Sequence, residues 1–98
     1  MFDLQAPPPS FLDQDRPVRP PRPVWIDLPG LFGAGDVVFG SGWAVGEQAP
    51  GELCCWGRAS TGAWIALVRY RLGRADGSGG GMMLTHWLPS RLVRPRDT

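Results

Sequence analysis

The side chains that could carry out catalysis are few and far apart in this chain. His86 is the only histidine, and no serine–aspartate pair or cysteine lies near it in the sequence. The carboxylates at Asp36, Glu47, Glu52 and Asp76 each stand alone in a predicted turn or at a predicted strand end. Acid–base and nucleophilic catalysis both need groups within hydrogen-bond reach of one another. We therefore predict a non-enzymatic protein without catalytic residues, in which His86 is either a hydrogen-bonded structural residue or part of a binding face.

The two cysteines, Cys54 and Cys55, are adjacent in the sequence. Neighbours in a strand point to opposite faces, so a bridge between them would be strained and we expect two free thiols in a reducing compartment. With His86 as the only other soft ligand, no metal site and no cofactor are expected. The segment Gly73–Gly81 has no lysine and no following helix, so it is not a phosphate loop. Without a signal peptide or an apolar run of about 18 residues, we expect a cytoplasmic protein with no membrane partner.

Tryptophan and arginine are the unusual residues of the chain. There are five tryptophans, and all ten cations are arginine. A GC-rich genome explains the absence of lysine but not the positions of the arginines. Exposed indole and guanidinium groups are the usual anchors of an interface, so one interpretation is that these residues form a binding surface. The alternative interpretation is that the tryptophans fill the core and its rim. The predicted binding residues lie beside bends, on the solvent side of a strand or near the C-terminus: Trp43, Arg69, Arg71, His86, Trp87, Arg91 and Arg94.

The longest predicted strand covers residues 63–72 and would hold two of these arginines. Its even positions are apolar, and its odd positions become polar from Arg69 onward, which is typical of a half-buried strand. Shorter strands are predicted at 37–39, 52–58, 82–88 and 92–95. The core should contain Val38, Leu53, Val68, Tyr70 and Leu92.

A second apolar face is predicted on the same strand. Ile65 and Leu67 occupy odd positions before the pattern becomes polar. A β domain this small can cover only one face of the strand, so we expect these two residues to meet the segment around Trp25 or a second copy of the chain. This pattern predicts self-association.

Proline and glycine divide the chain into two parts. Seven of the eleven prolines fall between Pro7 and Pro23, and most of the glycines follow Gly30. Dense proline favours an extended polyproline conformation, so residues 1–30 are predicted to be a proline-rich arm and residues 31–98 a small β domain. A core of about 65 residues is marginal by itself, which also favours a partner or self-association.

The order of these features resembles an SH3-like small barrel. The chain has five expected strands, a Gly-Asp-x-Val start at residues 35–38 and a one-turn element at Pro89–Arg91 before the last strand. The closing run, residues 85–95, is similar to the ends of Tudor-type and KOW-type modules. This resemblance implies an all-β, five-stranded SH3-like barrel, preceded here by the extended arm, that binds partners through an aromatic groove.

A narrower resemblance is to the type B plasmid dihydrofolate reductases, which are barrels of this size. Residues 32–38 fit that family's Phe-Gly-x-Gly-Asp-x-Val start, and residues 51–56 fit its Gly-x-x-x-x-Trp strand. The family forms a central pore from four barrels, so the resemblance implies an oligomer as a remote alternative. The pore uses a Val-Gln-Ile-Tyr run and a lysine, whereas this chain has Leu84–Trp87 there and no lysine.

Taken together, the sequence predicts an interaction module that binds a protein partner through an aromatic and arginine-rich surface, for example as a small subunit of a larger assembly. The low formal net charge of +1 and the tryptophan count favour protein as the partner. The alternative is a nucleic-acid-binding module. From residue 69 onward there are six arginines against two aspartates, or 6 − 2 = +4, and arginine interleaved with aromatics suits base stacking.

Overall fold

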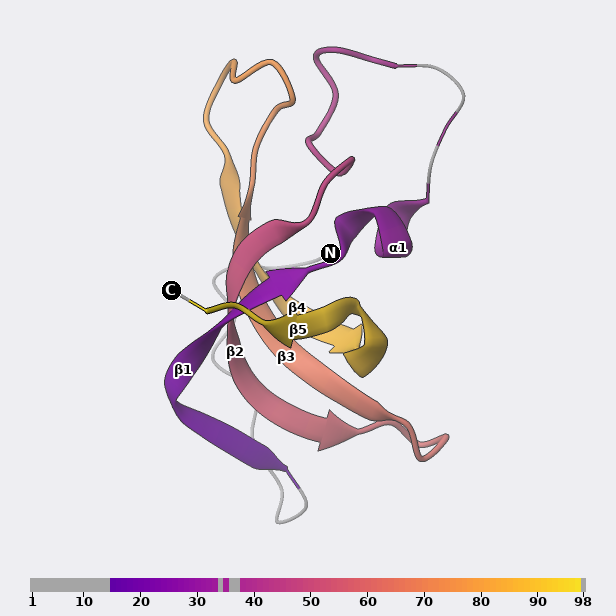
Figure 1. Ribbon diagram of the computed structural model, residues 1–98, viewed down its shortest axis with the longest axis vertical. Coiled ribbons are helices and arrows are strands. Elements are labelled where there is room, and N and C mark those ends of the chain that lie inside the picture. The colour runs from indigo at the N-terminus through magenta and orange to yellow at the C-terminus, as the bar shows by residue number, and fades with distance from the viewer. Residues whose placement is uncertain (1–14, 34, 36–37, 98) are drawn as a thin grey trace, which may run out of the picture.

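The structure is a computed structural model that describes residues 15–33, 35 and 38–97. Its elements are β1 (Arg16–Ile26), α1 (Leu28–Phe32), β2 (Ala49–Arg58), β3 (Trp64–Leu72), β4 (Met82–Pro89), the 3-10 turn η1 (Ser90–Leu92) and β5 (Val93–Pro95). The five strands form one antiparallel sheet in the order β4-β3-β2-β1-β5, and Figure 1 shows it curled into a half-barrel. The prediction of a mostly β, barrel-like fold is confirmed.

Strands β2, β3 and β4 form a meander centred on β3, as the alternation in residues 63–72 predicts. β3 and β4 pair from Ile65↔Pro89 to Leu72↔Met82 without a shift of register. The turn between β2 and β3 is closed by Ala59 N donating to Ala63 O at 2.8 Å. In β2 the register shifts between Leu53 and Cys55, so Cys54 occupies a bulge.

Residues 16–26, which belong to the predicted proline-rich arm, form strand β1 of the sheet, and the sequence did not predict this pairing. β1 pairs with β2 on one side and, only at Val24–Ile26, with β5 on the other. The pairing with β2 is also interrupted between Pro17 and Arg22, and the Arg19–Pro20 peptide is cis. Proline lacks an N–H and is tolerated only at strand edges and bulges. Because most of β1 has a neighbour on one side only, its prolines fit there. Residues 1–14 of the predicted arm lie outside the described residues.

The core lies on the concave face of the sheet. Leu53, Val68, Tyr70 and Leu92 are buried as predicted, at 5%, 0%, 1% and 2% exposure. They are joined by buried residues from β1, α1, β3 and β4: Val24, Ile26, Leu28, Ala66, Leu72 and Leu88.

The prediction for Val38 is wrong. Its side chain is 94% exposed, and neither Val38 nor Phe39 is in a strand, while Val37 lies outside the described residues. Val24 and Ile26 of β1 provide the first strand of the core instead. They have paired neighbours on both sides, from β2 and β5, which a three-residue run at 37–39 could not match.

The outer face of β3 is only partly open. Leu67 lies opposite Cys55 on β2 and Trp87 on β4, and it is only 5% exposed. A Cβ atom added at Gly57 would come within 2.9 Å of Cη2 of Trp87, so the indole lies against the backbone of β2. Leu67 was expected to be covered by the segment around Trp25 or by a second copy, and it is already buried in a single copy, while Ile65 is half-buried. Self-association stays a prediction that needs another surface.

Candidate functional site

An apolar concavity lies at one end of the inner face of the sheet, and we call it the tryptophan groove. It has a volume of about 420 Å³ and is lined by Arg16, Trp56, Trp64 and Ser90. Trp56 on β2 lies opposite the core residue Ala66 on β3. Trp64 lies two residues before Ala66 on β3, and alternate residues of a strand share a face, so both indoles are directed to the core side. Trp56 packs against the core, whereas Trp64 is 42% exposed. The groove therefore extends the core surface into solvent.

Polar groups surround the two indoles. Arg58 lies opposite Trp64 in the ladder, and its guanidinium carbon is 4.5 Å from the centroid of the indole. The same side chain donates from Nη1 to Gly62 O at 3.4 Å. Ser90 comes from η1 and Arg16 from the start of β1. The groove thus offers an apolar floor with cationic and hydroxyl groups at its rim, which suits an extended chain segment with apolar side chains.

None of the four residues that line this groove was predicted as a binding residue. A signal was present in the hairpin, because Trp56 and Trp64 flank the short turn at residues 59–63 and share a face once the register is known. Arg16 and Ser90 could not be found in this way, since they come from elements distant in sequence.

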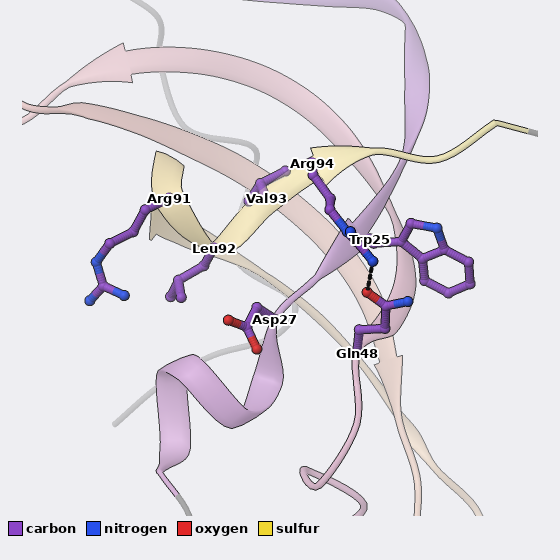
Figure 2. A pocket seen from close by; sticks show the side chains of 7 residues that line it. All are labelled: Trp25, Asp27, Gln48, Arg91, Leu92, Val93 and Arg94. Atoms are coloured by element: carbon purple, nitrogen blue, oxygen red, sulfur yellow. Dashed lines mark hydrogen bonds between the residues drawn. The ribbon is translucent and has the colours of Figure 1, made fainter.

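A second, more polar concavity lies between α1, η1 and β5, and we call it the arginine pocket. Its volume is about 220 Å³, and its lining is Trp25, Asp27, Gln48, Arg91, Leu92, Val93 and Arg94. Figure 2 shows Arg91 and Arg94 directed to opposite ends of the pocket, with Asp27 between them. Nη2 of Arg94 donates to Oε1 of Gln48 at 2.6 Å. Oδ1 of Asp27 accepts from Gly30 N at 3.0 Å. The two arginines therefore do not converge into one anion clamp.

The guanidinium groups of three arginines lie over indole rings. Besides Arg58 over Trp64, Arg74 lies 4.0 Å from the centroid of Trp43 and Arg96 lies 5.6 Å from that of Trp25. Such pairs are worth about 0.5–1 kcal/mol at exposed sites. The pairing of tryptophan with arginine is thus a recurrent feature of this surface.

The predicted binding residues are distributed over four places. Arg69 and Arg71 lie on the outer face of β3, and Trp87 lies on the same face of β4. Arg69 forms an ion pair with Glu52, which lies opposite it on β2. The guanidinium also donates a hydrogen bond to the Glu52 carboxylate, and this bond raises the pKa of Arg69. Arg91 and Arg94 line the arginine pocket.

His86 lies on the inner face, opposite Val68, and so on the other side of the sheet from Trp87. Its Nε2 is hydrogen-bonded to the hydroxyl of Tyr70 at 3.1 Å. Burial away from water lowers the pKa of His86 and raises the pKa of Tyr70. The neutral imidazole is therefore favoured, and in the tautomer protonated at Nδ1 the Tyr70 hydroxyl donates to Nε2.

Trp43 lies in the long connection before β2. It forms an isolated bridge with Arg74, and Ala44 N donates to Gly73 O at 2.7 Å. The connection is thus held against the loop between β3 and β4, and Trp43 remains 39% exposed.

The remaining reactive groups are the two thiols. Cys55 is buried and Cys54 half-buried, both are free, and burial raises the pKa of each. Within residues 15–33, 35 and 38–97, no cluster of three or more histidine, cysteine, aspartate or glutamate side chains could hold a metal ion. Over the same residues, no helix has the length and apolar character needed to cross a membrane.

Comparisons with protein-family models, with curated proteins and with solved structures find no match to this chain.

Proposed function

We propose that this protein is a non-enzymatic interaction module with an SH3-like fold that binds a protein partner in the tryptophan groove. The observation that carries the proposal is Trp64, an indole 42% exposed beside Trp56 in an apolar concavity. An apolar pocket with a few polar groups at its rim is the usual form of a binding site, and tryptophan and arginine dominate the energetics of interfaces. The strand order and the 3-10 turn before β5 support the SH3-like assignment.

The chemistry of the groove favours an extended peptide segment. Its floor is formed by two indoles, which suit apolar side chains and proline rings. The guanidinium of Arg58, already ordered by Trp64 and by Gly62 O, is placed to meet a carboxylate of the partner. The two free thiols support a reducing, cytoplasmic location.

A nucleic acid is the second candidate ligand, and a specific observation favours it. The described residues contain all ten arginines but only six acidic residues, so their formal charge is 10 − 6 = +4. One of these arginines, Arg69, forms an ion pair with Glu52. Arginine beside indole also fits a groove that contacts phosphates and stacks bases.

The test compares two exposed tryptophans that are each covered by an arginine. Trp64→Ala removes an indole of the groove, and Trp43→Ala removes a similarly exposed indole outside it. The ligands are a set of fluorescent decapeptides rich in proline and acidic residues, and a single-stranded oligonucleotide, each titrated at two salt concentrations.

We expect Trp64→Ala to weaken peptide binding by about 2 kcal/mol, or roughly 30-fold, with little salt dependence. Trp43→Ala should bind peptide as the unchanged protein does. Equal losses in both variants, or no peptide binding at all, would contradict the proposal. Oligonucleotide binding that falls with salt at a slope of about 0.7 per neutralised phosphate would support the second candidate instead.

A further inference from the structure

The outer edge of β4 is an open hydrogen-bonding edge of the sheet. Among the described residues, β4 is last in the strand order and pairs only with β3. It runs for eight residues without a register shift. The backbone groups on its other side therefore have no strand partner within the described part of the chain. Such an edge is a template for pairing with another chain.

The two edges of the sheet differ in how they are protected. Proteins usually prevent edge pairing with charged side chains, proline, bulges or very short strands. β5, at the opposite edge, has only three residues, and they include Arg94 and Pro95. β4 has no charged residue and no bulge, and its only proline is Pro89, the last residue. β4 thus lacks the protection that β5 has.

We propose that β4 pairs antiparallel with β4 of a second copy, so that one continuous sheet crosses a twofold axis. The axis passes midway between Thr85 and Thr85 of the partner subunit, which lie opposite each other. In this register residues 82–88 all find partners, and Pro89, which has no N–H, stays outside the ladder. An axis at His86 would bring Pro89 into the ladder opposite Met83, and an axis at Leu84 would leave Trp87 and Leu88 without partners.

The side chains of β4 are complementary to themselves in this register. On the outer face, Met83, which is 50% exposed, lies opposite Trp87 of the partner subunit. A thioether against an indole is a favourable contact. On the inner face, Met82 lies opposite Leu88 of the partner subunit. The pairing therefore places apolar side chains against one another on both faces of the sheet.

Electrostatics also permit a second copy as the occupant of this edge. β4 itself carries no charged side chain. The nearest arginine, Arg69 on β3, lies opposite Thr85 and is paired with Glu52. Its counterpart in the second copy would be three strand spacings away, or roughly 14 Å. That separation exceeds the Debye length of about 8 Å at physiological salt, so the repulsion is screened.

This inference goes beyond the proposed function and does not depend on it. The tryptophan groove is lined by residues of β1, β2, β3 and η1, and none of them belongs to β4. The dimer would carry two grooves. Loss of the dimer and loss of peptide binding are therefore separate results.

The experiment measures the mass of the full chain by sedimentation equilibrium, from micromolar to millimolar concentration, for three proteins: the unchanged chain, Thr85→Glu and Thr61→Glu. In the dimer the introduced carboxylate at position 85 would face the same carboxylate of the second copy across the twofold axis, and like charges directly opposite each other destabilise the pairing. In the monomer it lies opposite Arg69 and is tolerated. Thr61 is equally an exposed threonine, in the turn between β2 and β3, and serves as the matched control.

We expect the unchanged chain and Thr61→Glu to dimerise with the same dissociation constant, and Thr85→Glu to raise that constant at least tenfold. Amide exchange provides a second measurement on the unchanged chain if Thr85→Glu fails to fold: protection within residues 82–88 should increase with protein concentration. An unchanged chain that is monomeric at about millimolar concentration would overturn the proposal. So would a Thr85→Glu dimer of unchanged affinity, or protection in β4 that does not depend on concentration.

Discussion

Val68→Ala tests whether β3 is the centre of the core. Val68 has no exposed surface and lies between Leu53 on β2 and His86 on β4. The substitution deletes two carbons, each worth about 0.8 kcal/mol of burial, or about 1.6 kcal/mol together. A residual cavity of roughly 40 Å³ at about 24 cal/mol per Å³ adds about 1 kcal/mol. The free energy of unfolding should therefore fall by about 2–3 kcal/mol.

Urea denaturation followed by tryptophan fluorescence measures this change. For a domain of this size the dependence on urea is about 1 kcal/mol per molar, so the midpoint should fall by about 2–3 M. Val38→Ala makes the same chemical change at a side chain that is 94% exposed, and it should shift stability by less than about 0.5 kcal/mol. A midpoint for Val68→Ala within error of the Val38→Ala midpoint would refute the reasoning, because burial is the only property that separates the two sites in this argument.

Two further predictions concern the backbone of β2 and the inner face. A Cβ atom at Gly51 would lie 2.8 Å from a backbone carbonyl oxygen of β3, so Gly51→Ala should lower the free energy of unfolding by about 1–3 kcal/mol, as measured by thermal denaturation. Gly40→Ala is the control and should be neutral, because a Cβ atom there would have nothing within 4 Å. A Gly51→Ala protein as stable as the unchanged chain would count against the β2–β3 register. The lowered pKa of His86 means that the unfolded state binds the proton more readily, so stability is full above about pH 6.5 and falls as the pH drops towards the folded-state pKa. His86→Gln should flatten this fall in urea titrations at about pH 7, 6 and 5.5, and an unaltered profile would remove His86 as its cause.

The local pattern of the sequence was sufficient to predict the central strand. In residues 63–72 an alternation of apolar and polar side chains specifies which face is buried, because successive side chains of a strand point to opposite sides. That pattern identified Val68 and Tyr70 as core residues and Arg69 as an outward residue, and the structure confirms all three. The succession of short strand patterns separated by turn residues likewise predicted a mostly β fold.

The candidate site was only partly predictable. Tryptophan and arginine were recognised as the residues of interest, but the groove is formed by Trp56 and Trp64 rather than by the predicted Trp43 and Trp87. Exposure at the end of a sheet depends on where the core stops, and this depends on the elements that cover the inner face. His86 was expected to be either a hydrogen-bonded structural residue or part of a binding face, and the register of β4 turns it inward, where it is hydrogen-bonded to Tyr70.

The sequence by itself determined the strands whose pattern is written in neighbouring residues, together with the residue types available for binding. Only the tertiary structure decided that residues 16–26 belong to the sheet. Proline is acceptable in this strand because most of its length lacks a partner on one side. The partner is lacking because β5 is short and pairs with Val24–Ile26 alone. It also decided that Val38 is exposed and that Arg16 and Ser90 line the same groove as the two indoles. These outcomes rest on pairings between residues far apart in the chain, whose free energy comes from contacts that no local window of sequence contains.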